Sequence, residues 1–176
     1  YRALNNMAQQ AISKGDMAAA QNYLKQAAQV SKNASEVNTN LALMALKGGD
    51  VAKAETYLAQ GSGSNTFKEV MGNLNIAKGN YTQAASDLAG VNTNSAALAQ
   101  ILAKDYTSAK STLANIKNAD AITSYLQAVL AARTDDASTL ASSLQRAVQQ
   151  DATLATRAAN DLEFAKYASV IKNIVK

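Results

Sequence analysis

The chain has 176 residues, 48% of them hydrophobic, and a formal net charge of +4 at pH 7. It contains no cysteine and no histidine, which excludes disulfides, thiolate nucleophiles, histidine acid–base catalysis and the usual zinc sites. It also contains no proline that would interrupt a helix and no apolar run of 18 residues, so we expect no membrane-spanning segment.

A ten-residue sequence motif recurs along the chain and predicts its architecture. It begins at Gly15, Gly49, Gly79 and Lys104, which are 34, 30 and 25 positions apart. Each copy starts with Gly or Lys, continues with Asp or Asn, and then has a helical run in which an Ala is followed four residues later by a Leu. A weaker fifth copy begins at Asp135, 31 positions after Lys104. Such a unit cannot bury its apolar face alone, so the repeated motif predicts a stack of helical hairpins.

The repeated motif divides the chain into five expected pairs of helices and a closing segment. In chain order the expected pairs are 2–14 and 16–31, 36–47 and 50–60, 66–78 and 81–89, 94–103 and 105–116, and 120–133 and 136–150. Closing helices at 152–160 and 161–175 should cover the last apolar face, as the terminal unit of a stack requires. The run 61–65 (Gly-Ser-Gly-Ser-Asn) is interpreted as a turn, because neither a strand pattern nor a Gly-Lys-Ser/Thr sequence accompanies it as in a phosphate-binding loop.

The 34-residue spacing and the small residues inside the units resemble the tetratricopeptide repeat. In that family two antiparallel helices touch at small residues in positions 8, 20 and 27 of each unit. Counted from Tyr1, Ser35 and Asn65, these positions hold Ala8, Ala20 and Ala27, then Ala42, Ala54 and Gly61, then Gly72 and Ala84. The chain departs from the family in lacking Trp and Pro and in its shorter later units, so the resemblance is degenerate after about residue 90.

The resemblance implies an all-α fold. It implies a right-handed α-α superhelix, a tetratricopeptide-like solenoid of about five helical hairpins plus a C-terminal capping segment. It also implies a single repeat domain over residues 1–176, with units at about 1–34, 35–64, 65–89, 90–119 and 120–150 and a cap at 151–176. Because the sequence starts at Tyr1, directly inside a repeat, we expect it to be a fragment of a longer protein.

The family resemblance also implies a binding surface. Its members bind a protein or peptide in a concave groove lined by the first helices of the units. We therefore expect a non-catalytic protein–protein interaction scaffold with no cofactor and no metal. Carried over onto this chain, the expected groove residues are Arg2, Asn5, Gln9, Thr39, Leu43, Lys47, Asn73, Ile76, Asn94, Leu98 and Ile101.

Two carboxylate pairs are the remaining candidates for acid–base chemistry, Asp135 with Asp136 and Asp161 with Glu163. Both pairs lie where helices are expected to begin. Acidic side chains there satisfy free backbone N–H groups and the helix dipole, so we interpret the pairs as caps. Two other functions stay open. One is a helical accessory or catalytic domain of an envelope glycan-acting enzyme, which would require two facing carboxylates in a deep pocket; the other is a purely structural spacer.

Surface composition bears on partners and location. The Lys and Arg residues are spread along the chain rather than gathered in a stripe, so we do not expect nucleic acid as a partner. The segments 94–100 and 125–129 resemble repeat regions of exported envelope proteins of Bacteroidetes-type bacteria, including OmpA-like proteins. Charged residues are only 17% of the chain, and this polar but weakly charged composition agrees with the resemblance. We therefore expect a periplasmic or cell-envelope location.

Overall fold

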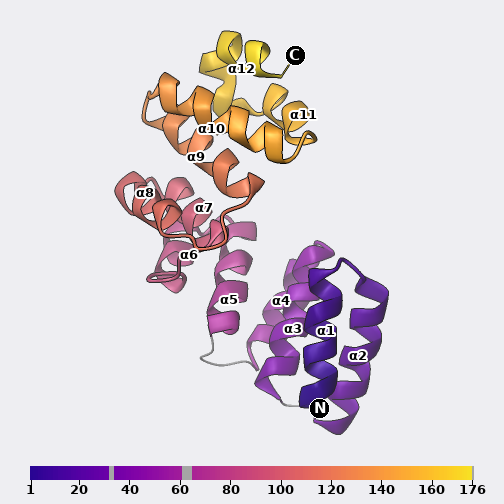
Figure 1. The fold of residues 1–176 in the computed structure, drawn as a ribbon. Coiled ribbons are helices and arrows are strands. Elements are labelled where there is room, and N and C mark those ends of the chain that lie inside the picture. The colour runs from indigo at the N-terminus through magenta and orange to yellow at the C-terminus, as the bar shows by residue number, and fades with distance from the viewer. Residues whose placement is uncertain (32–33, 61–64, 176) are drawn as a thin grey trace. The chain divides into compact units, whose positions relative to one another are not determined.

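Helices make up all regular secondary structure in the described residues, which are 1–31, 34–60 and 65–175 of a computed structural model (Figure 1). The chain divides into two compact units, Tyr1–Leu88 (unit 1) and Ala89–Lys176 (unit 2). Each unit is built from consecutive helical hairpins. The expected all-α helical-repeat fold is therefore confirmed.

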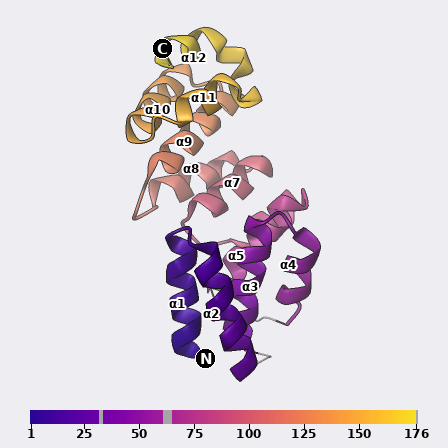
Figure 2. The same cartoon turned by 90° about the vertical axis from the view of Figure 1, so that its right-hand side faces the viewer.

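The described helices of unit 1 pair into three hairpins, which can be followed in Figures 1 and 2. Each new hairpin packs on the one before it, because α3 contacts both α1 and α2, and α5 contacts both α3 and α4. The helices are α1 (Arg2–Ser13) and α2 (Met17–Val30), α3 (Ser35–Lys47) and α4 (Val51–Leu58), and α5 (Asn65–Ala77) and α6 (Tyr81–Asp87). Of the run 61–65 interpreted as a turn, residues 61–64 lie outside the described residues.

Unit 2 contains two further hairpins and a closing segment. The hairpins are α7 (Asn94–Leu102) with α8 (Tyr106–Ala114) and α9 (Ala121–Arg133) with α10 (Ala137–Gln150). The closing segment consists of α11 (Leu154–Ala159), the 3-10 helix η1 (Leu162–Tyr167) and α12 (Ala168–Ile174). The helix expected at 161–175 is thus split in two. Asp161 accepts a hydrogen bond from the Glu163 N–H and Phe164 inserts against Tyr125 of α9, so this stretch winds tightly before α12 begins.

All five hairpins share one turn, closed by a residue with a left-handed backbone. The φ angle is +79°, +80° and +79° at Gly15, Gly49 and Gly79, and +64° and +58° at Lys104 and Asp135. In each turn the N–H of the following residue donates to the carbonyl five positions earlier, over 2.8–2.9 Å. This pattern is the Schellman motif, which satisfies the last free carbonyls of a helix. Lys104 and Asp135 therefore do stand in for glycine.

The residue after the left-handed position begins the next helix. Asp16, Asp50, Asp105 and Asp136 each accept a hydrogen bond at Oδ1 from the backbone N–H three positions later, over 3.0–3.2 Å. At α6 the corresponding residue is Asn80, whose side chain makes no capping hydrogen bond. A carboxylate in this place satisfies a free N–H and interacts favourably with the helix dipole. Two consecutive residues thus end one helix and start the next.

A small residue packed against a leucine holds each hairpin together. The small residue lies seven positions before the left-handed turn residue, and the leucine lies nine positions after it. The pairs are Ala8 and Leu24, Ala42 and Leu58, Gly72 and Leu88, Ala97 and Leu113, and Ala128 and Leu144, and all ten residues are buried. The tightest approach is in the third hairpin, where a Cβ added to Gly72 would lie 2.5 Å from Leu88 Cγ. The absence of side-chain bulk at this position therefore lets the two helices touch.

We expect Gly72→Ala to destabilise unit 1. The added methyl group would overlap Leu88, and overpacking of a core contact costs up to about 3 kcal/mol, which exceeds the roughly 1 kcal/mol that alanine gains over glycine in a helix. Chemical denaturation measures the change. Ser86→Ala, on the exposed side of α6, is the matched control and should stay within about 0.5 kcal/mol. A Gly72→Ala protein as stable as the original would contradict the packing described here.

Lys104→Gly should stabilise unit 2. A side chain in the left-handed region costs about 1–2 kcal/mol, and the greater freedom of glycine in the unfolded chain offsets part of the gain, so we expect roughly 0.5 kcal/mol net. Lys110→Gly, inside α8, removes the same charge but should cost about 1 kcal/mol. Thermal unfolding of both variants provides the comparison, and equal losses of stability would show that the Lys104 turn is not strained.

Candidate functional site

The binding residues expected in unit 1 lie on α1, α3 and α5, which pack side by side. Gln9, Leu43 and Asn73 each lie six positions before the left-handed turn residue of their hairpin, so they occupy the same place on three successive helices. Gln9 is exposed, and Leu43 and Asn73 are half-buried. We name these three residues the first-helix row. The two expected cations, Arg2 and Lys47, are also exposed.

Three of the expected binding residues have side chains in the interior. Asn5 is 7% exposed and its Oδ1 accepts a hydrogen bond from Asn40 Nδ2 over 2.8 Å, which links α1 to α3. Thr39 is 2% exposed and its hydroxyl donates to the Ser35 carbonyl over 2.8 Å. Ile101 is completely buried in the core of unit 2. Asn5 and Ile101 thus contact neighbouring helices, and Thr39 bonds within α3, so a partner would have to contact the other eight.

Asn94 and Leu98 of α7, the remaining expected residues of unit 2, are half-buried. Asn94 Nδ2 donates to Asp120 Oδ1 over 3.1 Å, and Asn94 Oδ1 accepts from the Thr123 hydroxyl over 2.8 Å. The pKa of Asp120 is lowered, first by the hydrogen bond from the Thr123 N–H and also by the bond from Asn94. Both ends of the Asn94 amide thus position the start of α9. Leu98 packs against the core of the unit.

The closing segment covers the inner face of α9. Tyr125 lies ten positions before its turn residue, the place that Asn5 holds in α1, and Asn5 contacts the next hairpin. Tyr125 in turn donates its hydroxyl proton to Asp161 Oδ2 over 2.6 Å, and its ring meets that of Phe164 edge to face at 5.5 Å. Burial, followed by the bond to Asp161, raises the pKa of Tyr125 above its ordinary value. The segment therefore packs where a further hairpin would, as expected of a cap.

A bidentate ion pair also holds the closing segment against α9. Arg133 Nε donates to Glu163 Oε2 over 2.8 Å and Arg133 Nη2 donates to Oε1 over 2.5 Å. The third contact of this guanidinium is the Ile101 carbonyl, 3.0 Å from Nη1. Hydrogen bonding to Glu163 is the first cause that raises the pKa of Arg133. One side chain thus ties together α7, α9 and η1.

The four carboxylates considered for acid–base chemistry all have structural partners. Asp136 caps α10, and Asp161 joins Tyr125 to the Glu163 N–H. Glu163 pairs with Arg133, and Asp135 accepts from Lys166 Nζ over 2.6 Å. Across the described ranges no three acidic side chains gather as metal ligands would. Each of the four carboxylates is therefore engaged in a hydrogen bond or ion pair of the fold.

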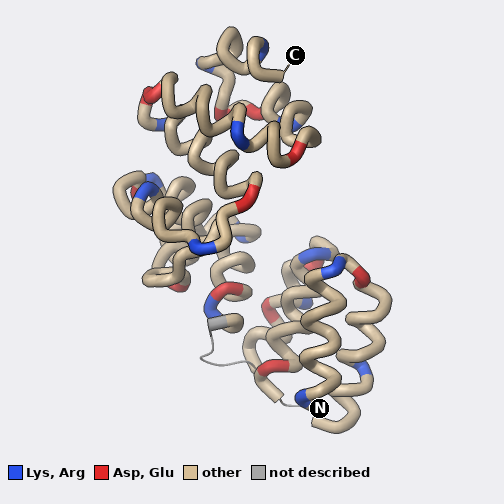
Figure 3. The backbone as a smooth tube through the Cα atoms, viewed as in Figure 1, with Lys and Arg blue, Asp and Glu red and all other residues tan. Residues whose placement is uncertain are grey.

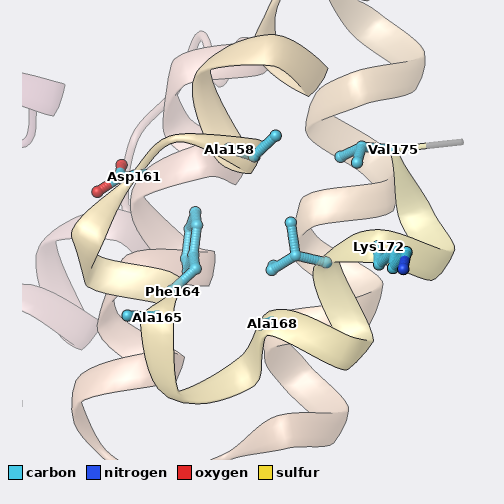
Figure 4. A pocket seen from close by; sticks show the side chains of 9 residues that line it. Ala158, Asp161, Phe164, Ala165, Ala168, Lys172 and Val175 are labelled. Atoms are coloured by element: carbon cyan, nitrogen blue, oxygen red, sulfur yellow. The ribbon is translucent and has the colours of Figure 1, made fainter.

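A small pocket lies within the closing segment, between α11, η1 and α12 (Figure 4). Its volume is about 230 Å³, and Ala158, Phe164, Ala168 and Val175 supply most of its apolar wall. Asp161 lies at its edge and is already bonded to Tyr125. The other charged residue in the lining is Lys172, whose side chain is exposed and takes part in none of the described ion pairs. With one carboxylate engaged and an alanine-rich wall, the pocket offers few polar groups that would orient a substrate.

Charged side chains of both signs are interspersed along the two units (Figure 3). The described ion pairs are Lys78 with Glu55, Arg133 with Glu163, and Lys166 with Asp135. None of the helices in the described part of the chain combines the length and the apolar character needed to cross a bilayer. The surface therefore offers mixed polar contacts over short distances rather than one strong field.

Comparison with known proteins supports the repeat assignment. A family model of the tetratricopeptide repeat matches residues 11–69, a segment that begins in α1 and ends in α5. No curated protein and no solved structure matches the chain. The turns and the buried small residues of the matched segment recur in unit 2, so the fold of the chain is that of a tetratricopeptide-like helical repeat. Repeats of this family generally mediate protein–protein interaction.

We expect Arg133→Met to destabilise unit 2 by about 3 kcal/mol, because it leaves the partly buried Glu163 carboxylate without its partner. Lys166→Met is the matched control. It removes the same charge from an ion pair whose lysine side chain is 72% exposed, and such solvent-exposed pairs contribute little to stability, so we expect a much smaller loss. Urea denaturation followed by circular dichroism measures both. Equal effects of the two substitutions would contradict a structural role for the Arg133 contacts.

Proposed function

We propose that this tetratricopeptide-like repeat protein is a non-catalytic scaffold that binds a protein or peptide segment across the first helices of unit 1. The observation that carries the proposal is the first-helix row, Gln9, Leu43 and Asn73, repeated at one place on three helices that pack against one another. A partner lying across α1, α3 and α5 would meet the same position three times. Repetition of this kind suits an extended segment better than a compact small molecule.

The chemistry of the row supports a peptide as partner. Gln9 and Asn73 carry amides, which can donate to and accept from a peptide backbone at once. Leu43 between them, with half-buried Ile76 nearby in α5, offers apolar surface for a side chain. Lys47 and Arg2 are exposed and lack ion-pair partners among the described residues, so they favour acidic groups on the partner.

Photo-crosslinking in the source cells tests this surface. A photoreactive amino acid placed at Gln9, Lys47 or Asn73 should give an adduct with one and the same partner. The matched positions Gln21 and Lys53 are exposed on the second helices α2 and α4 and should give none. Adducts of equal yield from the second helices would contradict the assignment. An absence of adducts from all five positions would favour the structural-spacer alternative.

The location is also a proposal: we place the protein in the periplasm or elsewhere in the cell envelope. Support comes from the low content of charged residues, which make up 17% of the chain. Osmotic shock of the source cells, followed by immunoblotting, should release the protein with periplasmic markers or leave it with envelope membranes. Recovery with cytosolic markers alone would contradict the proposal.

A further inference from the structure

The outer side of unit 2 carries a groove that is separate from the first-helix row. Its volume is about 860 Å³, its walls are the second helices α8 and α10, and its floor is α9. The groove follows α10 from Asp136 to Arg146, ten residues that span about 15 Å in a helix. An extended peptide advances about 3.3 Å per residue, so the groove has room for roughly four or five residues.

A polar residue in the floor departs from the repeat pattern. Gln127 lies eight positions before its turn residue, where α3 and α5 carry Leu41 and Met71. Leu41 and Met71 pack against the core of the preceding hairpin, whereas Gln127 is half-buried and lines the groove. Its side-chain amide makes no hydrogen bond within the described chain. A free primary amide in this position can pair with the N–H and C=O of a passing backbone.

The two cations of the groove are not equivalent. Lys110 lies close enough to Asp136 to contribute to the lowered pKa of that carboxyl, although the hydrogen bonds from Thr139 are the larger causes. Arg146, at the far end of α10, takes part in none of the described ion pairs. Since Asp136 is occupied as the cap of α10, the unbalanced charge in the groove is positive and lies at the Arg146 end.

Part of the groove lining is apolar. Leu113 of α8 and Leu130 and Ala131 of α9 contribute this surface, and Ser111 of α8 and Ser142 of α10 contribute hydroxyl groups. This combination suits a peptide with one apolar side chain flanked by polar ones. A neutral oligosaccharide fits less well, because the one aromatic residue that lines the groove, Tyr106, is half-buried and interacts with Arg133.

We propose that the α8–α10 groove binds an extended acidic peptide segment of about four or five residues. A carboxylate of the segment pairs with Arg146, its backbone pairs with the Gln127 amide, and a central apolar side chain packs on Leu113 and Leu130. A second carboxylate at the other end approaches Lys110. The site is independent of the first-helix row, so either surface can fail while the other holds.

Amide chemical-shift titration of the ¹⁵N-labelled full chain tests the proposal at low salt. The probe is the acetylated and amidated peptide Glu-Ser-Leu-Ser-Glu, and the control is Gln-Ser-Leu-Ser-Gln. We expect the acidic probe to shift amides of α8, α9 and α10 and to bind at least about tenfold more tightly than the control, because the control lacks both the carboxylate that pairs with Arg146 and the one that approaches Lys110. Added salt should weaken binding of the acidic probe alone.

Two substitutions locate the contact. Arg146→Gln should weaken binding of the acidic probe about tenfold and leave the control peptide unaffected. Lys117→Gln makes the same change of charge in unit 2 outside the groove and should leave both affinities unchanged. Thermal unfolding of both variants should match that of the original chain, because both side chains are exposed.

Several outcomes would overturn the proposal. They are equal affinity for the two peptides, shifts confined to α1, α3 and α5, no shifts at millimolar peptide, or larger shifts of the groove amides with maltopentaose than with the acidic probe. Shifts on the first helices of unit 1 would support the proposed function while removing the groove, and groove shifts alone would do the reverse.

Discussion

The close approach of two helices at a residue with little or no side chain is the constraint on which the rest of the structure depends. Seven positions before each turn the chain has Ala or Gly, and the leucine of the returning helix fills the space beside it. The turn between them is a left-handed residue followed in four hairpins by a capping aspartate, and it sets where the returning helix starts. A bulkier residue at the crossing would push the helices apart and misplace every contact that follows.

The small residues at the helix crossings also affect the surface that a partner could contact. Because alanine fills the crossings, the core is thin, and neighbouring hairpins are held together partly by polar contacts such as Asn5 with Asn40 and Arg133 with Glu163. Asn40 Oδ1 is even left without a hydrogen-bond partner among the described residues, a cost that buried polar contacts carry when only partly satisfied. The faces that remain free are polar with small apolar patches, which suits recognition of chain segments rather than enclosure of a substrate.

Much of the fold follows from the sequence, because its signals are local. Each copy of the turn motif determines a helix end and a helix start within a few residues, and the observed hairpins agree closely with the expected ranges. The candidate binding site is harder to predict from the sequence. Asn5 and Thr39 lie at the edge of the helix face, where periodicity alone does not decide between a partner and the next hairpin. Contacts across 30 positions, such as Arg133 with Glu163, leave no local signal. Gln127 was not singled out from the sequence, although it is a polar residue at a repeat position where α3 and α5 carry Leu41 and Met71.

Methyl nuclear Overhauser spectroscopy on a chain labelled at Ala and Leu tests the packing constraint most directly. The account predicts a cross-peak between the alanine and the leucine of the same hairpin in four cases, Ala8 with Leu24, Ala42 with Leu58, Ala97 with Leu113, and Ala128 with Leu144. Cross-peaks from these alanines to leucines of other hairpins, without those within the hairpin, would contradict it.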